Sequence, residues 1–441
     1  MFTIKVFEHQ TIKVGDKLIF YRGGEGREGV LEDKYISALW KMYDEKKRPF
    51  FTPSRGGIKF CQWVGVIKVL DLTLEILPKA DRRDNFNSQE EQTKWQSILT
   101  DMLRVCHSLD TPTVSNASLK LKSNSVLDLY VERFINEVNY LLHAGLIRKY
   151  RKEEVNHTAL KGKLLLQNHI AKNVVHKEMF FISKTTYDRD HLLNQILAKA
   201  IKILPLICNN QYLISKCYQL QLHFPEVKDI EVNIATFNKI AYDRKSDSYK
   251  IAIQIAKLLL LNYRPDVSSG STNSIAILFD MNKLWEEYIC RMLQKANDGT
   301  LKIYNQQSTQ FWNHNNTNRY LKPDIVIEKL TASIGKEYLV IDTKWKNIYN
   351  NVKNVGMDDL RQMFAYHHYF DAARCYLLFP GIDNVENGSF NSQSFFKQSI
   401  LGEKSCGIII SQAWNKEGKR GFLNKDIGLN ILSSLSLLEP I

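Results

Sequence analysis

The spacing of apolar residues divides the chain into a strand-rich beginning, a helical middle and a mixed C-terminal part. Apolar and polar residues alternate from Met1 to Phe7, and the segment from Phe60 to Lys79 contains two β-branched runs joined near Leu70-Asp71. Alternation is typical of strands, and two such runs in succession predict a hairpin. We therefore expect residues 1–85 to form a β-rich N-terminal domain.

Helical spacing replaces this alternation from about residue 88 onwards. Ser125 is a suitable N-cap, and the apolar residues that follow it recur at helical intervals until Gly145. The segments from Asn194 to Leu206 and from Ile251 to Leu261 repeat the pattern. This periodicity predicts a mostly helical middle region over residues 86–264.

Three polar segments interrupt the apolar pattern. The glycine-rich segment from Phe20 to Arg27 predicts a turn or loop, and it lacks the GxxxxGK[ST] pattern of a nucleotide-binding loop. The basic stretch from Lys149 to Lys163 fits a solvated loop and a phosphate or partner contact equally well. The segment from Arg264 to Ser271 combines proline, glycine and small polar residues, which predicts a linker or long loop. We place a domain boundary there and expect a third domain over residues 272–441.

Four elements follow this boundary in order. A helix reads MNKLWEEYICRML, a strand follows Pro323-Asp324, a second strand reads YLVIDTK, and a last helix contains QMFAY. The segment from Glu328 to Lys336 is a suitable hairpin connection between the two strands. The pattern therefore predicts two strands side by side with a helix before and after them.

These two strands carry residues that suit metal-assisted hydrolysis. Asp324 and Asp342 offer carboxylate oxygens, and the backbone carbonyl of Thr343 offers another, which are the ligands that Mg²⁺ prefers. Side chains alternate along a strand, so Asp342 and Lys344 point to one face while Thr343 points away. The Lys344 ammonium can then orient or help deprotonate an attacking water, whose pKa the metal lowers. The pattern predicts hydrolysis of a phosphodiester.

The [DE]xK triplet that begins at Asp342 is, by itself, weak evidence for a catalytic site. Only Asp342 has both an upstream Pro-Asp strand and its own preceding apolar run. An ordinary ion pair with Lys344 is the alternative interpretation, but an uncompensated carboxylate at the end of a buried strand is costly. The triplet [DE]xK also begins at Glu32, Glu45, Glu226, Asp243 and Glu417.

Three helical residues are further candidates. Gln362 and Tyr366 lie one helical turn apart and share a face, where they can hydrogen-bond to the metal ligands or to a DNA backbone. Glu286 lies on the helix before the strands. The alternative is that the pair is a feature of the helix surface and that Glu286 is solvated like its neighbour Glu287.

Composition changes this picture mainly through charge. The chain has 441 residues, and its lysines and arginines exceed its aspartates and glutamates by 13. Such an excess favours polyanionic partners, nucleic acids first, although a charge that only maintains solubility is the alternative. Seven cysteines without a CxxC pair argue against a zinc ribbon or a disulfide framework. Without a long apolar segment or a signal-peptide core, we expect a cytoplasmic protein with no membrane partner.

The chain contains, in this order, the motifs VGVIKVLDLTLEILPK, LLHAGLIRKYRKEE, LKGK, Asp190 with Asn194, DMNKLWEEYI, PDIVI, VIDTKWK and QMFAY. Together they resemble McrC, the endonuclease subunit of the McrBC modification-dependent (5-methylcytosine) restriction system. QMFAY also resembles the Gln-xxx-Tyr element of RecB-like nucleases, which favours a role for Gln362 and Tyr366, and LWEEYI matches Glu286 rather than Glu287. Lys163 stands where related chains often carry Arg.

The resemblance implies a mixed α+β and α/β multidomain chain that ends in a restriction-endonuclease-like domain of the PD-(D/E)xK type. Mg²⁺, for which Mn²⁺ can substitute, is the implied cofactor, with Asp324, Asp342 and Thr343 as its ligands. The implied catalytic residues are Asp324, Asp342, Lys344, Glu286, Gln362 and Tyr366.

The implied partner is a hexameric, McrB-like AAA+ GTPase. The N-terminal domain of such a chain docks on the ring and stimulates GTP hydrolysis, while the GTPase binds the nucleotide and reads modified bases in double-stranded DNA. The chain would then cut DNA only in the assembly. The alternatives are a PD-(D/E)xK subunit of a different defence or repair complex and a non-catalytic activator of the GTPase.

Overall fold

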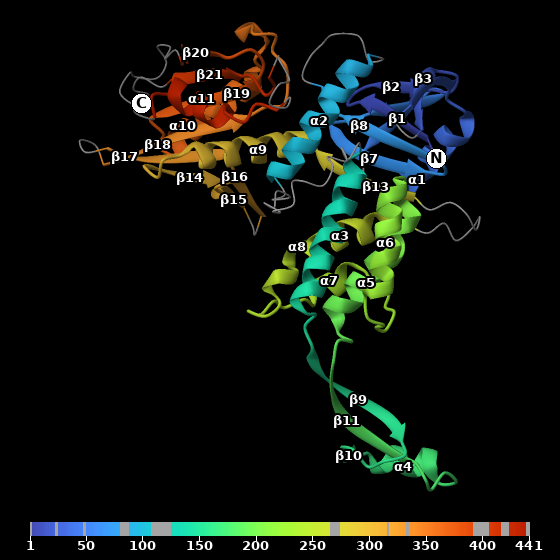
Figure 1. Ribbon diagram of the computed structural model, residues 1–441. Coiled ribbons are helices and arrows are strands. Elements are labelled where there is room, and N and C mark those ends of the chain that lie inside the picture. The colour runs from blue at the N-terminus through green and yellow to red at the C-terminus, as the bar shows by residue number, and fades with distance from the viewer. Residues whose placement is uncertain are drawn as a thin grey trace. The chain divides into compact units, whose positions relative to one another are not determined.

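The computed structural model describes residues 2–22, 25–46, 50–79, 88–106, 125–264, 274–314, 317–331, 335–390, 405–415 and 423–437. The fold mixes helices and strands, with a β-rich N-terminal region and a largely helical middle (Figure 1). Contacts group the described residues into two compact units, the first with residues 66–72, 125–264 and 274–277 and the second with the others. In the described part of the chain, no helix is long and apolar enough to cross a membrane.

The second unit combines described residues from the N-terminal and the C-terminal parts of the chain. The domain boundaries predicted near residue 85 and at residues 264–272 were placed where the secondary structure changes. The two compact units are instead defined by contacts between residues. Helix α2 (Gln89–Cys106) packs on α9 (Met281–Ala296), so residues before and after the middle region share one core.

The N-terminal strands confirm the alternation found in the sequence. The first sheet is built from β1 (Phe2–Phe7), β3 (Lys17–Arg22), β4 (Glu25–Val30), β7 (Trp63–Val69), β8 (Leu72–Leu77), β12 (Tyr263–Arg264) and β13 (Ser274–Asp280). Their order is β12-β13-β7-β8-β1-β3-β4. Leu70, at the predicted turn, has a left-handed φ of 54°. Strands β2 (Thr11–Lys13), β5 (Phe51–Ser54) and β6 (Gly57–Phe60) form a small sheet, and α1 (Asp33–Lys46) lies between β4 and β5 in the chain.

The glycine-rich segment from Phe20 to Arg27 is strand where the structure describes it, and residues 23 and 24, where the predicted turn would lie, are outside the described residues. Its described residues belong to β3 and β4, which pair in antiparallel register. A Cβ on Gly26 would lie 2.8 Å from the Ile19 side chain, and one on Gly29 would lie 2.8 Å from the Phe20 ring. The glycines therefore make room for large cross-strand neighbours, a role that the sequence pattern does not distinguish from a turn.

The first unit confirms the three predicted helices. Ser125 caps α3 (Val126–Ala144) by accepting a hydrogen bond from the Leu127 N–H at 3.2 Å, and Gly145 ends the helix with a φ of 88°. This unit also contains α5 (Leu192–Ile207), α6 (Gln211–His223), α7 (Ile234–Asn238) and α8 (Lys250–Asn262), with a short 3₁₀ helix at Asp247–Tyr249.

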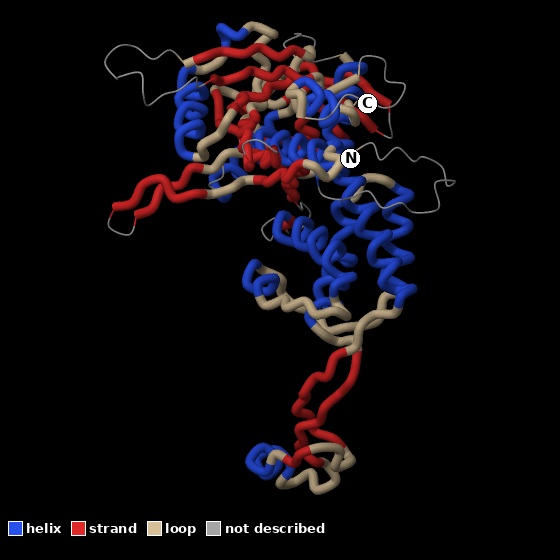
Figure 2. Tube along the Cα trace, turned by 90° about the vertical axis from the view of Figure 1, so that its left-hand side faces the viewer, coloured by secondary structure: helices blue, strands red, loops and turns tan. Residues whose placement is uncertain are grey.

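The basic stretch from Lys149 to Lys163 is largely strand, and only residues 158–162 form a loop. It begins with β9 (Lys149–His157), which pairs along its whole length with β11 (Phe180–Asp188). Figures 1 and 2 show this hairpin extending from the helices of its unit, with β10 (Lys163–Leu164) and α4 (Leu166–Asn173) near its tip. The strand was not recognised because both of its faces are polar, so no apolar alternation marks it. The linker predicted from Arg264 to Ser271 lies, apart from Arg264, outside the described residues.

The C-terminal part of the second unit is a six-stranded mixed sheet with helices against it. Its strands are β14 (Leu301–Asn305), β17 (Ile325–Thr331), β18 (Gly335–Thr343), β19 (Arg374–Pro380), β20 (Asn384–Ser389) and β21 (Ser405–Ser411). Their order is β14-β17-β18-β19-β21-β20, with β18, β19 and β21 parallel. The remaining elements are α10 (Met357–Tyr369), α11 (Ile427–Ser434), a 3₁₀ turn at Val352–Asn354, and a separate ribbon of β15 (Thr309–His314) with β16 (Thr317–Leu321).

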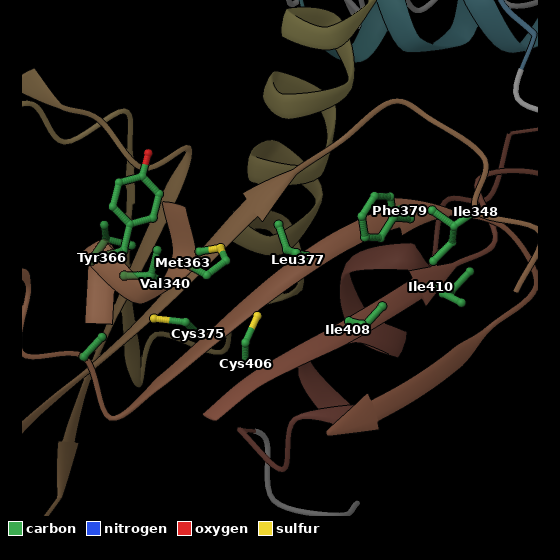
Figure 3. Packing of buried hydrophobic residues seen from close by; sticks show 12 residues of the cluster. Val340, Ile348, Met363, Tyr366, Cys375, Leu377, Phe379, Cys406, Ile408 and Ile410 are labelled. Carbon is green, nitrogen blue, oxygen red and sulfur yellow. The ribbon is translucent and has the colours of Figure 1, made fainter. Parts of the chain in front are cut away.

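Helix α10 covers one face of this sheet. Met363 and Tyr366 of the helix belong to a buried cluster with Val340, Leu377 and other sheet residues (Figure 3). Both predicted strands and both predicted helices are present, but the hairpin connection predicted from Glu328 to Lys336 is too long. The strands continue to Thr331 and resume at Gly335.

Candidate active site

Two neighbouring strands bring Asp324 and Asp342 to the same end of the six-stranded sheet. Ile325 of β17 pairs with Ile341 of β18 in antiparallel register. Asp324 directly precedes the first of these residues and Asp342 directly follows the second, so the two aspartates lie opposite one another across the strands. The prediction that these strands lie side by side is confirmed.

The Asp324 carboxylate is held by the strand that carries Asp342. Its Oδ2 accepts hydrogen bonds from the Thr343 backbone N–H at 2.7 Å and from the Thr343 hydroxyl at 2.9 Å. Alternation along β18 points the Thr343 side chain away from Asp342 and Lys344, and its hydroxyl hydrogen-bonds to Asp324. Residue 343 therefore orients one of the two carboxylates.

Lys344 joins the strands to helix α10. Its Nζ lies 2.7 Å from Asp342 Oδ2 and 3.8 Å from Asp359 Oδ1, and it donates a hydrogen bond to Gln362 Oε1 at 3.2 Å. The Asp342 side chain is almost completely buried, whereas that of Lys344 is 26% exposed. The ammonium is thus fixed from several directions and still reaches solvent.

The helical pair lies beside these strand residues. Gln362 donates through Nε2 to Asp342 Oδ1 at 3.3 Å and to the Tyr366 hydroxyl at 2.7 Å. Tyr366 is 2% exposed, and Figure 3 shows its ring near Met363 and Val340 at one end of the buried cluster. Gln362 therefore contacts the strand carboxylate directly, while Tyr366 acts on it only through Gln362.

Helix α9 adds Glu286 to the site. Glu286 is 8% exposed, and its Oε1 accepts a hydrogen bond from Gln306 Nε2 at 2.5 Å. The neighbouring Glu287 instead pairs with Arg291, at 2.9 Å, on the same helix. Burial raises the pKa of Glu286, and the charges of Asp324 and Asp342 add to this effect.

Burial and mutual repulsion make these acids harder to ionise. Burial, followed by the charge of Asp324, raises the pKa of Asp342 to about 6. The same two causes raise the pKa of Glu286 to about 7, and burial raises the pKa of Asp324. Burial lowers the pKa of Lys344, but the carboxylates, Asp342 first, outweigh it, so that pKa is above its ordinary value. The site concentrates negative charge around one fixed ammonium.

The oxygen donors of the site fit a hard divalent cation. In the ranges that the structure describes, no group of three or more His, Cys, Asp and Glu side chains is arranged to hold a metal ion. Asp324 and Asp342 could supply two side-chain oxygens, and the Thr343 carbonyl could supply a third. Mg²⁺ needs only one or two carboxylates because it keeps several waters, and its charge would relieve the repulsion between the aspartates.

Two contacting residues were missed in the sequence. The Gln306 N–H donates to the Asp324 carbonyl at 2.8 Å, and its side chain holds Glu286. Asp359 contacts Lys344 and also accepts from Lys346 at 3.1 Å. Asp359 lies three residues before Gln362, a spacing that places both on one helix face, so a signal existed for it. A lone glutamine after a strand gives no such signal.

The family follows from comparison with known proteins. Residues 58–380 match the family model described as the McrBC 5-methylcytosine restriction system component. The chain belongs to this McrBC family. No curated protein sequence matches the chain.

Solved structures of McrBC assemblies contain chains similar to this one. A chain of the half-complex from the tetradecameric assembly of Thermococcus gammatolerans McrB AAA+ hexamers with bound McrC is 18% identical, with a TM-score of 0.64. The match covers 99% of this chain and 100% of that one. A chain of the Thermococcus gammatolerans McrBC complex is 20% identical, with a TM-score of 0.48, over 67% of this chain and 88% of that one. At these identities, the first match supports the fold alone.

Proposed function

We propose that the chain is the DNA-cleaving subunit of a McrBC restriction system, a Mg²⁺-dependent endonuclease of the PD-(D/E)xK type. The observation that carries this proposal is the joint contact of Asp342 with Lys344 and Gln362 at the strand end where Asp324 also lies. An ordinary surface ion pair needs neither the burial of Asp342 nor a second carboxylate opposite it.

The proposed mechanism assigns each side chain a task. Asp324, Asp342 and the Thr343 carbonyl would hold Mg²⁺, with Mn²⁺ as a substitute. When bound, the ion would lower the pKa of water and neutralise charge on the scissile phosphate. Lys344, fixed by its contacts with Asp342 and Gln362, orients the attacking water and stabilises the negative charge that develops on the phosphate.

The surrounding residues hold this arrangement in place. Gln362 fixes one oxygen of Asp342 and the Lys344 ammonium at the same time, and Tyr366 fixes Gln362. Glu286 contributes a further carboxylate whose pKa of about 7 allows it to exchange a proton near neutral pH.

The family also supports a partner. In the similar Thermococcus gammatolerans assembly, McrC is bound to McrB AAA+ hexamers, and we propose that this chain likewise binds a hexameric AAA+ GTPase and stimulates it. In this proposal residues 1–85 dock on the ring, the GTPase reads modified bases in double-stranded DNA, and cutting in the cytoplasm requires the assembly. No nucleotide site is assigned to this chain.

Plasmid cleavage with the partner GTPase tests the proposal. Methylated and unmethylated plasmids are incubated with Mg²⁺, GTP and either the wild type or Asp342→Ala. We expect only the wild type to cut, with methylated plasmid preferred, while both stimulate GTP hydrolysis equally. Equal cutting by both would place the active site elsewhere and make this chain a scaffold for its partner.

A further inference from the structure

The two-stranded ribbon of β15 and β16 is an exposed element without an assigned role. It lies outside the six-stranded sheet, near β14 in Figure 1. Large aromatic side chains remain open on it, with Phe311, Trp312 and Tyr320 each between 51% and 56% exposed. A two-stranded hairpin is marginally stable alone, so open aromatic residues on it indicate a surface that contacts a partner.

The composition of the ribbon indicates which kind of partner. Residues 306–322 contain no aspartate and no glutamate, but they contain Arg319, Lys322 and many side-chain amides. Because it lacks carboxylates, such a surface does not repel phosphate groups. Side-chain amides, guanidinium groups and aromatic rings are groups that contact bases and sugar-phosphate backbones. Its chemistry is complementary to a nucleic acid.

The pairing register separates two faces. Trp312 pairs with Arg319 across the strands, and His314 stacks on the Trp312 ring with centroids 5.8 Å apart. On the other face, Asn318 accepts from Gln310 and donates to the Tyr320 hydroxyl, both at 3.4 Å. One face is therefore cationic and aromatic, and the other offers amides and a phenol.

The ribbon is anchored to the candidate active site. Gln306, just before β15, contacts both the Asp324 carbonyl and Glu286. A bulge places Phe311 out of register, and its ring packs edge-on against Tyr369 of α10 with centroids 5.7 Å apart. The Tyr369 hydroxyl also donates to the Gln310 carbonyl. A molecule held by the ribbon would therefore extend toward Asp324.

We propose that this ribbon enters a groove of duplex DNA beside the phosphate that is cut, and so positions the duplex for cleavage. The inference rests on the proposed nuclease function and names the surface that holds its substrate. A two-stranded β-ribbon fits the B-DNA major groove, which is about 12 Å wide. Arg319 and Lys322 would contact phosphates, while the amide face would contact base edges.

Equilibrium binding of the full chain to a labelled duplex in EDTA, with or without the partner GTPase, tests this surface. The test variant carries Trp312→Ala with Arg319→Gln. The control carries Leu330→Ala with Lys295→Gln, which removes an exposed apolar side chain and an exposed cation from the same unit, outside residues 1–85. We expect the test variant to bind about tenfold more weakly and to lower the slope of log affinity against log salt by about one, and the control to match the wild type.

Two further measurements separate the possible failures. Stimulation of GTP hydrolysis without DNA should stay at the wild-type level, which shows that the variant is folded and assembled. The inference is wrong if the ribbon variant binds DNA with the affinity and salt slope of the wild type. It is also wrong if the variant loses GTPase stimulation but keeps normal DNA affinity, because the ribbon would then contact the protein partner. If the Asp342→Ala chain cuts plasmid, the nuclease proposal is wrong. The DNA-binding measurement would then still decide whether the ribbon binds DNA.

Discussion

At the scale of single residues, the site depends on side chains that hold other side chains. Gln362 contacts three neighbours through its amide, since it accepts from Lys344 and donates to Asp342 and Tyr366. Residues that hold metal ligands or a catalytic ammonium affect the rate of cleavage by fixing the positions of those groups. When such a residue is removed, the groups that it held can rotate away from the substrate.

Gln362→Leu should therefore slow cleavage about 10- to 100-fold, because it releases Asp342 and Lys344 together. Tyr366→Phe removes only the hydroxyl that accepts from Gln362, so we expect a loss of a few-fold. Single-turnover cleavage at saturating DNA, in the assembly with the partner GTPase, measures both. An equally large loss in Tyr366→Phe would instead give the hydroxyl a direct role.

Glu8 predicts a pH dependence of stability. Its Oε1 accepts from the Lys79 N–H at 2.8 Å and from Trp345 Nε1 at 2.7 Å, and burial raises its pKa from 4.5 to about 7. Because the folded pKa exceeds the unfolded one, the folded state binds more protons in this window. The stabilising contribution of Glu8 is complete below pH 4.5 and is lost as the pH rises through about 7.

Glu8→Gln should gain stability relative to the wild type between about pH 5 and pH 8, by on the order of 1–3 kcal/mol. Urea unfolding of both proteins at several pH values measures the difference. Glu25→Gln, at an exposed glutamate that pairs with Arg27, is the control for the substitution itself. A constant difference between Glu8→Gln and the wild type at all pH values would contradict the assignment.

At the scale of elements, the sequence was most informative where apolar spacing had a clear period. The helix after Ser125 and strands β17 and β18 were predicted because one face of each is apolar. Strand β9 was missed because its exposed hairpin has polar residues on both faces, and β3 with β4 was missed because glycine is as common in turns as beside bulky cross-strand neighbours. Asp324, Asp342 and Lys344 could be predicted because each stands at a strand end, whereas the contact of Gln306 depends on tertiary structure.

Helices α9 and α11 meet at a glycine. A Cβ added at Gly428 would overlap the backbone carbonyl of Met292. Gly428→Ala should therefore destabilise the second unit by about 1–3 kcal/mol, because backbone rather than a flexible side chain must move. Thermal unfolding measures the loss, and Asn430→Ala, at an exposed position of the same helix, should cost much less. Equal melting of Gly428→Ala and the wild type would mean that the two helices separate without cost.

At the scale of the whole molecule, the compact unit that carries the site is not continuous in sequence. Trp345, next to Lys344, packs against Trp285 with ring centroids 5.2 Å apart and against Trp95 of α2 at 6.5 Å. Trp95 also contacts Trp414 at 5.3 Å. The residues beside the candidate active site therefore complete their core with side chains from the N-terminal third of the chain.

A fragment of residues 272–441, the domain expected from the sequence, should consequently fail to fold as it does in the full chain. It lacks Trp95 and Glu8, so Trp345 would lose an aromatic neighbour and its hydrogen-bond acceptor. Because large aromatic residues contribute much of a core's burial, we expect red-shifted tryptophan emission and rapid proteolysis of the fragment. Co-expression with residues 1–106 supplies the missing elements and should restore protection, whereas the same N-terminal piece carrying Trp95→Ala should restore it poorly. A fragment that alone resists proteolysis and unfolds cooperatively would show that the C-terminal part is an independent domain. Its contacts with α2 and Glu8 would then serve another purpose than completing its core.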